Sequence, residues 1–282
     1  MQNIGRGIWR SSSKIKGPHV TLLGGIHGNE LVGIHIIRRF QETCLPLVAG
    51  TLTVILGNPL AIESGTRGSR PHFDLNRCFS SDNLLNSNSN FEKDNENYEM
   101  TRARELAPYL AECDVMIDLH STNKPSLPFI RIAGEIAKNM DVNSDTNIVN
   151  LILQYLPCDI LLTDPTYLLA GHVSLTDEYV GACNGVGICY ESGVASDLNA
   201  VDKVYDSLVC ILKKFKMIDQ NNIQTTTIPC FPPSQYTLST VRHLLQHNNC
   251  IKVYRSLISR HKASRGQTVL DNITFNAFHP IK

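Results

Sequence analysis

The sequence has no excess of charge of either sign, since 26 basic residues balance 26 acidic residues in a chain of 282. Without a surplus of positive charge, neither nucleic acid nor an anionic membrane surface is an expected partner. No apolar stretch approaches the roughly 18 residues that span a bilayer, and the first residues lack the continuous apolar core of a secretory signal. We therefore expect a cytoplasmic protein that acts on a small molecule or a peptide, and the sequence leaves a homo-oligomer open.

Two further absences narrow the class of protein. The nine cysteines show neither CxxC spacing nor the framework of a small disulfide-rich domain, so we expect mostly reduced thiols. No Gly-x-Gly-x-x-Gly pattern follows the first strong apolar run, which removes the main support for a dinucleotide cofactor. Neither a disulfide scaffold nor a dinucleotide-binding domain is expected.

Short apolar runs alternate with helical patterns up to residue 215. We expect strands at 20–23, 51–56, 114–119, 129–132, 160–162 and 187–190, and helices at 31–40, 98–112, 145–155, 174–180 and 199–215. Alternation of this kind predicts an α/β fold with a mixed, mostly parallel sheet flanked by helices. Such sheets carry their functional sites in the loops at the carboxyl ends of the strands.

Composition divides the chain near residue 219. Residues 80–97 are rich in Ser, Asn and Asp and predict an exposed loop, whereas residues 219–233 shift to Asn, Gln, Thr and Pro and predict a linker. About 50 residues follow, too few to bury a strong core of their own. We therefore predict a main domain over residues 1–218, followed by the linker and a small β-rich C-terminal segment over residues 219–282.

The most informative stretch is Gly-Gly-Ile-His-Gly-Asn-Glu at residues 24–30. It follows an apolar run that predicts a buried strand and precedes the start of a helical pattern. An imidazole and a carboxylate three residues apart on such a turn, His27 and Glu30, can converge on one cation. Catalytic zinc sites often use two His and one Glu and leave one position open for water.

A second histidine follows another strand. In Asp-Val-Met-Ile-Asp-Leu-His-Ser-Thr, residues 114–122, the two-residue period of a strand places Asp118 and His120 on the same side. His120 could be a structural histidine, but beside His27 and Glu30 it is the candidate for the third metal ligand. Asp118 could orient its ring, as a carboxylate behind a metal-bound histidine commonly does.

Two other stretches carry polar groups suited to a substrate. Arg67, Arg70 and Arg77 lie within about ten residues, and Arg77 follows Asn76 in Asp-Leu-Asn-Arg. Arginine binds carboxylates through two parallel hydrogen bonds, although a solvated loop with surface ion pairs would look the same. The other stretch, Cys-Tyr-Glu-Ser-Gly, ends a strand in Glu191, and a glutamate beside a metal-activated water can transfer protons.

The four motifs GGIHGNE, DLNRCF, DLHST and YESG appear in this order over residues 19–193. In this respect the chain resembles the succinylglutamate desuccinylase/aspartoacylase family of the zinc carboxypeptidase-like fold. The resemblance implies that His27, Glu30 and His120 bind one Zn²⁺ per chain and that Glu191 activates water. It also implies that Asn76 and Arg77 hold the carboxylate of the substrate.

The resemblance further implies an arginine shortly before Asp-Leu-Asn-Arg that polarises the scissile carbonyl. Arg67 and Arg70 both qualify, and Arg67 is preferred because Thr66-Arg67 resembles the Thr-Arg pair of the family. The chain also departs from the family: residues 177–184 lack the arginine with which aspartoacylases read a second carboxylate, and the segment after residue 219 is short. The reaction class therefore carries over, and the named substrate does not.

The expected function is zinc-dependent hydrolysis of the amide of an N-acyl amino acid or a related small carboxylate. A zinc carboxypeptidase acting on peptides or peptidoglycan fragments would use the same groups. Cover of the site by the C-terminal segment would decide between these two hypotheses. A homologue that binds metal without turnover is the third hypothesis.

Overall fold

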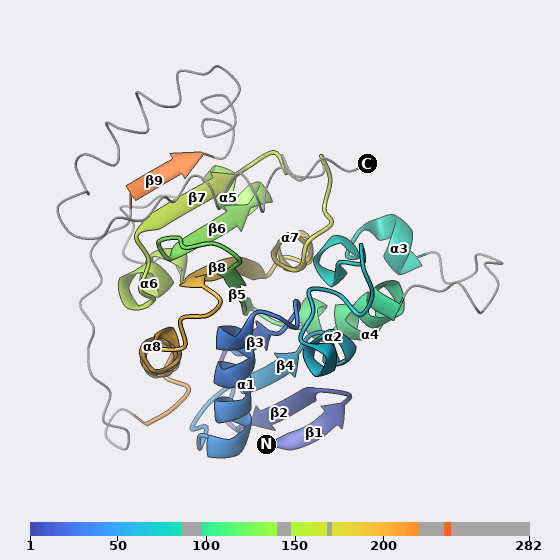
Figure 1. Ribbon diagram of the computed structural model, residues 1–282. Helices are drawn as coiled ribbons and strands as arrows, with labels where there is room; N and C mark the ends of the chain where they lie inside the picture. Colours follow the sequence, from blue (N-terminus) through green and yellow to red (C-terminus); the bar gives the residue numbers. More distant parts are fainter. Residues whose placement is uncertain (86–97, 140–147, 168–170, 220–233, 238–282) are drawn as a thin grey trace.

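The computed structural model describes residues 1–85, 98–139, 148–167, 171–219 and 234–237. Its centre is a nine-stranded sheet with the order β1-β2-β4-β3-β5-β8-β6-β7-β9, covered by helices on both faces (Figure 1). The strands are β1 (Gln2–Gly5), β2 (Ile8–Ser12), β3 (His19–Gly24), β4 (Thr51–Leu56), β5 (Val115–Thr122), β6 (Phe129–Ala133), β7 (Ile160–Asp164), β8 (Val186–Val194) and β9 (Ser234–Thr237).

The strands that carry the site motifs run parallel in the middle of this sheet. β3 pairs in parallel with β4 and β5, and β5 pairs in parallel with β8. The antiparallel pairs are β1 with β2, β2 with β4, and β6 with β8. The expected mixed, mostly parallel α/β sheet is therefore confirmed.

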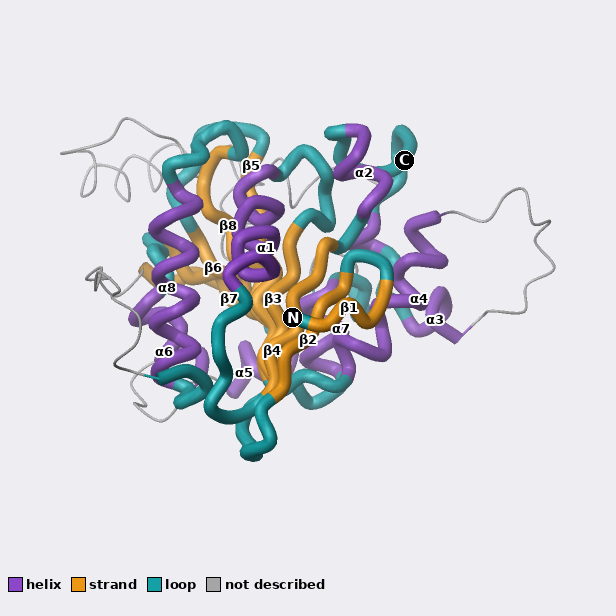
Figure 2. Tube along the Cα trace, turned by 90° about the horizontal axis from the view of Figure 1, so that it is seen from below, coloured by secondary structure: helices purple, strands orange, loops and turns teal. Residues whose placement is uncertain are grey.

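Helices form a layer on each side of the sheet (Figure 2). α1 (Leu31–Thr43), α6 (Ile148–Tyr155) and α8 (Ala200–Lys214) cover one face, where their apolar side chains join the larger core cluster. The other face carries α2 (Pro59–Ser64), the 3-10 helix η1 (Leu75–Arg77), α3 (Ser81–Leu85), α4 (Tyr98–Ala111), α5 (Gly134–Asn139) and α7 (Thr176–Ala182). No helix among the described residues is long and apolar enough to cross a membrane.

The expected strands and helices are observed within a few residues of their predicted bounds, but the sequence did not predict several short elements, among them α2, η1 and α5. The hairpin of β1 and β2 was not expected, since its short strands hold few apolar residues. The expectation of a loop over residues 80–97 is wrong for α3, and the rest of that stretch lies outside the described residues. Apart from β9, which joins the main sheet beside β7, the predicted C-terminal segment also lies outside them, so the domain boundary stays a prediction.

The loop after β3 comes very close to α2, and its glycines make this approach possible. Gly25 has a φ of +68°, and a Cβ atom on Gly28 would lie 1.9 Å from the carbonyl oxygen of Ala61. Only a residue without a side chain fits such a position. This turn brings His27 and Glu30 to the carboxyl ends of β3 and β5, the edge where parallel sheets carry their sites.

Candidate active site

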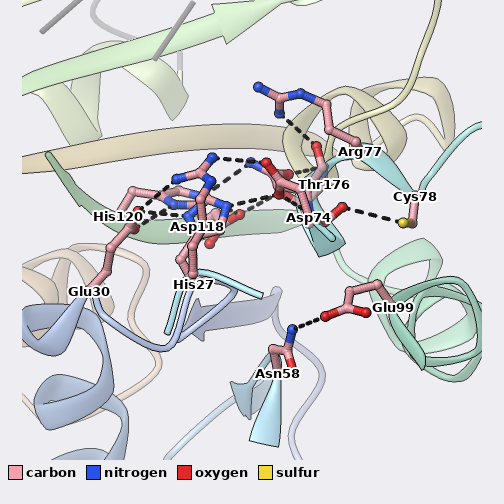
Figure 3. A network of polar contacts seen from close by, with 12 residues as sticks. His27, Glu30, Asn58, Asp74, Arg77, Cys78, Glu99, Asp118, His120 and Thr176 are labelled. Carbon is pink, nitrogen blue, oxygen red and sulfur yellow. Dashed lines mark hydrogen bonds and ion pairs between the residues drawn. The ribbon is translucent and has the colours of Figure 1, made fainter. Parts of the chain in front are cut away.

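Three side chains converge at this edge of the sheet, two from the loop after β3 and one from β5 (Figure 3). The Nδ1 atom of His27 lies 2.7 Å from one carboxylate oxygen of Glu30, and the Nδ1 atom of His120 lies 2.9 Å from the other. One ligand atom of each residue falls within 4.8 Å of the others, and each residue is only 3% exposed. Glu30 directly precedes α1, yet its side chain turns to the histidines and does not cap the helix.

A carboxylate stands behind each imidazole. The Nε2 atom of His27 lies 2.9 Å from Asp74 Oδ1, and the Nε2 atom of His120 lies 2.9 Å from Asp118 Oδ2. These contacts leave both Nδ1 atoms directed at the same point. A carboxylate in this position fixes the ring orientation and tautomer of a metal-binding histidine. The expected pairing of Asp118 with His120 is therefore observed.

The charges around the two rings favour a cation. Although burial opposes the charged form, the carboxylates of Glu30 and Asp74 raise the pKa of His27, and those of Asp118 and Glu30 raise the pKa of His120. Burial of the Glu30 carboxyl would raise its pKa, but the two histidines hold that pKa below its ordinary value. The carboxylates that favour a positive charge on these imidazoles also provide the negative surroundings that a divalent cation requires.

Glu191 stands next to this group with a free oxygen. It is the register partner of His120 in the parallel pair of β8 and β5, so both side chains project from the same face of the sheet. Its Oε2 atom is buried and accepts no hydrogen bond among the described residues. Burial, followed by the charge of Glu30, raises the pKa of Glu191 to about 7. A carboxyl with such a pKa can both take and give a proton near neutral pH.

Of the two candidate arginines, Arg67 reaches this group. Its Nη2 atom donates to Asp74 Oδ2 at 2.9 Å, and its Nη1 atom lies 3.6 Å from Glu30 Oε1. Its side chain is 37% exposed, so the guanidinium stands between the buried carboxylates and solvent. Arg70 is exposed on the same loop. The geometry favours Arg67 for the predicted role at the carbonyl.

Of the two residues predicted to hold the carboxylate of the substrate, Asn76 lies in the interior and Arg77 at the surface. Asn76 is buried, accepts a hydrogen bond from the backbone N–H of Thr176 at 3.1 Å, and has its Nδ2 atom 3.4 Å from His120 Nε2. Arg77 is exposed and donates to the backbone oxygen of Asn76 at 2.8 Å. Asn76 therefore lies in the site and Arg77 at its border, and their roles with substrate stay predictions.

The donor set fits zinc. Two imidazole nitrogens and one carboxylate are a typical set for catalytic zinc, and such sites keep a further position for water or substrate. The carboxylates of Asp74 and Asp118 contact the two histidine rings from behind. The Oε2 atom of Glu191, which has no hydrogen-bond partner among the described residues, lies on the same face of the sheet as His120. His27, Glu30 and His120 are the residues that would hold the ion.

Comparison with known proteins shows the family of this chain. Residues 16–200 match the family described as the succinylglutamate desuccinylase/aspartoacylase catalytic domain, which is more than half of the chain. The chain belongs to this family. The resemblance of the four motifs is thereby confirmed, and the match spans every predicted site residue.

Individual relatives in the succinylglutamate desuccinylase/aspartoacylase family match over shorter stretches. A probable aspartoacylase from Nostoc sp. is 42% identical over 113 residues, which cover 36% of this chain and 35% of the relative. An N-acyl-aromatic-L-amino acid amidohydrolase (carboxylate-forming) from Xenopus tropicalis is 32% identical over 164 residues, 55% of this chain and 49% of the relative. The chain thus spans between a third and a half of the length of these relatives.

Solved structures of other proteins share the fold. The succinylglutamate desuccinylase from Chromobacterium violaceum superposes with a TM-score of 0.60 at 18% identity, over 83% of this chain and 74% of that one. The ectoine utilization protein EutE (DoeB) from Ruegeria pomeroyi gives a TM-score of 0.59 at 16% identity, over 82% and 65%. At this identity the likeness establishes the fold alone.

Three residues of the site and its surroundings escaped the sequence analysis. Asp74 lies in a quoted motif, but its contact with His27 spans 47 residues and follows from folding alone. Thr176 donates to Asp118 from the start of α7 and carries no signal of its own. Arg131 could have been found, because a charged residue within the apolar run Phe-Ile-Arg-Ile-Ala indicates a buried ion pair.

Proposed function

We propose that this chain is a zinc-dependent amidohydrolase that cleaves the amide bond of an N-acyl amino acid or a related small carboxylate. The observation that carries the proposal is the convergence of two Nδ1 atoms and the Glu30 carboxylate next to the free oxygen of Glu191. Family membership supports the reaction class, and the relatives named as amidohydrolase and aspartoacylase support acyl amino acids as substrates.

The chemistry divides between the ion and the side chains. A bound zinc ion would supply Lewis acidity, which polarises the scissile carbonyl and lowers the pKa of a water molecule. Glu191 takes a proton from the attacking water, whose oxygen bonds to the carbonyl carbon. The same carboxyl then gives that proton to the leaving nitrogen as the C–N bond breaks. The products are a carboxylate and a free amino acid.

Arg67 and the buried Asn76 complete the proposed site. Negative charge develops on the carbonyl oxygen when water adds, and the guanidinium of Arg67, 3.6 Å from Glu30, stands at the border of the site to stabilise it. We assign Asn76 and Arg77 to the carboxylate of the substrate. Arg70, exposed on the loop that carries Arg67, would contribute to attraction of the anion rather than to chemistry.

The proposal is tested by assay of the purified chain, loaded with one equivalent of zinc, against a panel of substrates. The panel contains N-acetyl-aspartate, N-acetyl-phenylalanine, N-succinylglutamate and a peptide whose N-terminus is blocked and whose C-terminal carboxylate is free. Release of a free amino acid from any N-acyl compound, lost after chelation and restored by zinc, supports the proposal. Cleavage of the peptide alone indicates a carboxypeptidase, and zinc binding without any turnover indicates a binding protein.

A further inference from the structure

Thr176, the first residue of α7, joins two parts of the site that lie far apart in the sequence. Its hydroxyl donates to the carboxylate of Asp118, 58 residues away, and its backbone N–H donates to Asn76 Oδ1 at 3.1 Å, 100 residues away. The side chain is fully buried. Because the backbone N–H of Thr176 needs an acceptor, the amide oxygen of Asn76 faces Thr176 and its Nδ2 atom faces His120.

The hydroxyl of Thr176 is one of two groups that hold the carboxylate of Asp118 in place. Asp118 is fully buried, and its Oδ2 atom receives both His120 Nε2 at 2.9 Å and the hydroxyl of Thr176. Its Oδ1 atom has no hydrogen-bond partner in the part of the chain that the structure describes. A buried carboxylate with few donors is costly, so loss of one leaves it free to turn away from the ring of His120.

The start of α7 is itself held in place by a buried ion-pair cluster. Arg131 on β6 lies 2.7 Å from Asp177 Oδ2 and 2.8 Å from Asp164 Oδ2, and it also contacts Glu178. Asp177 and Glu178 directly follow Thr176, so two charged contacts hold the turn that presents the hydroxyl. Removal of one partner from such a cluster leaves a buried charge uncompensated and destabilises the fold. Variants of Arg131 would therefore report on folding, whereas Thr176 can be changed with little strain.

We propose that Thr176 is a positioning residue that acts on His120 through Asp118 and holds Asn76 beside it. This inference rests on the proposed function, since it assumes that His120 binds zinc. The hydroxyl keeps the Asp118 carboxylate in line with Nε2 of His120, which keeps Nδ1 directed at the shared point with Glu30 and His27. The hydrogen bonds of Thr176 go to Asp118 and Asn76, which are not among the three proposed metal ligands.

The test compares three variants of the full-length chain. Thr176→Val keeps the branched shape and the backbone N–H but removes the hydroxyl, and Thr176→Ser retains the hydroxyl. Thr53→Val is the matched control, because Thr53 is also fully buried and its hydroxyl contacts Arg10 and His19 at 3.1 and 2.8 Å. These contacts lie at the opposite, amino-terminal end of β3.

The readout is the dissociation constant for zinc, measured by competition with a chromogenic chelator, alongside the melting temperature. We expect Thr176→Val to weaken zinc binding about 10–100-fold, the range for loss of a contact behind a metal ligand. Thr176→Ser should stay within about threefold of the parent, and Thr53→Val should leave the constant unchanged even if it melts earlier. A Thr176→Ala variant serves in place of Thr176→Val if the latter does not fold.

The outcomes separate the two proposals. A parent that binds no zinc contradicts the proposed function and, with it, the role of His120 on which this inference rests. A parent that binds zinc normally, together with a folded Thr176→Val variant of equal affinity, overturns the positioning role alone. Equal weakening in Thr53→Val and Thr176→Val would assign the effect to general loss of stability and would also overturn it.

Discussion

His120 and Glu191 occupy the same level of two neighbouring parallel strands, β5 and β8, as register partners. Side chains of register partners project from the same face of a sheet, so a proposed metal ligand and a proposed proton carrier are fixed side by side by backbone pairing. The distance between them is therefore set by the pairing of β5 with β8. Loop movement would change the approach of substrate but not this relationship.

The first prediction concerns the proton carrier. Glu191→Gln keeps the size of the side chain but removes its ability to accept a proton, so kcat on an N-acyl amino acid should fall about 10²–10⁴-fold. Zinc content should stay at one ion per chain, because Glu191 is not among the three proposed ligands. Mass spectrometry of the metal and steady-state kinetics on the same sample check both parts. A variant with normal kcat would contradict the role.

The second prediction concerns the stability of the metal-free protein. The pKa of Glu191 is about 7 in the folded chain and about 4.5 when unperturbed, so the folded state holds this proton more tightly. Stability contributed by the protonated form is present at low pH and is lost as pH rises from 4.5 to 7. Because Gln cannot ionise, the free energy of unfolding of Glu191→Gln should rise relative to that of the parent by ~3 kcal/mol as pH increases from 4.5 to 7. Urea unfolding at pH 5 and pH 8 measures the difference, and an equal gain at both values would contradict it.

The sequence predicted the parts of the site that depend on local pattern. His27 and Glu30 lie on one turn, and Asp118 and His120 lie two apart on one strand, so residue spacing alone brings each pair together. Strand-end placement then predicted that the two pairs meet at one edge of the sheet. The apolar runs of β3, β4 and β5 were clear for the same reason, since buried parallel strands are continuously apolar.

What the sequence left open depends on loops and long-range contacts. Arg67 and Arg70 share one loop and one chemistry, and only the folded path turns the former toward Asp74 and leaves the latter exposed. The hairpin of β1 and β2 also escaped notice, because strands at a sheet edge keep a polar face and show little apolar signal.

The third prediction separates these two arginines. Arg67→Ala removes the guanidinium next to Glu30 and Asp74, and kcat should fall about 10²–10³-fold, as for loss of one oxyanion donor. Arg70→Ala is the matched control, with the same charge change on the same loop, and should alter kcat less than about threefold. Steady-state kinetics of both variants at saturating zinc make the comparison. If the two effects are reversed, Arg70 is the residue that stabilises the oxyanion.

The fourth prediction concerns the carboxylate behind His27. Asp74→Asn weakens the hold on Nε2 of His27, and the zinc dissociation constant should rise about 10–100-fold. At a zinc concentration of about 100 times the parent's own dissociation constant, the parent should gain about 2.7 kcal/mol of unfolding free energy. The variant should gain less at the same concentration, because it binds zinc more weakly. Thermal melting with and without zinc checks both. Asp82→Asn, an exposed change on α3, should match the parent.

The fifth prediction tests the tight packing of the loop that carries His27. A Cβ atom at residue 28 would lie 1.9 Å from the carbonyl oxygen of Ala61, and its three nearest neighbours are all backbone atoms of α2, so no flexible side chain can yield. Gly28→Ala should therefore cost more than about 4 kcal/mol and reduce zinc binding, since the loop must move away from α2. Gly65→Ala is the matched control: its φ is +63°, but a Cβ atom would meet nothing within 4 Å. That change should cost only the roughly 1–2 kcal/mol of a left-handed backbone and leave zinc affinity intact. Equal melting temperatures and equal zinc affinities for the two variants would show that this loop does not need to pack so closely on α2.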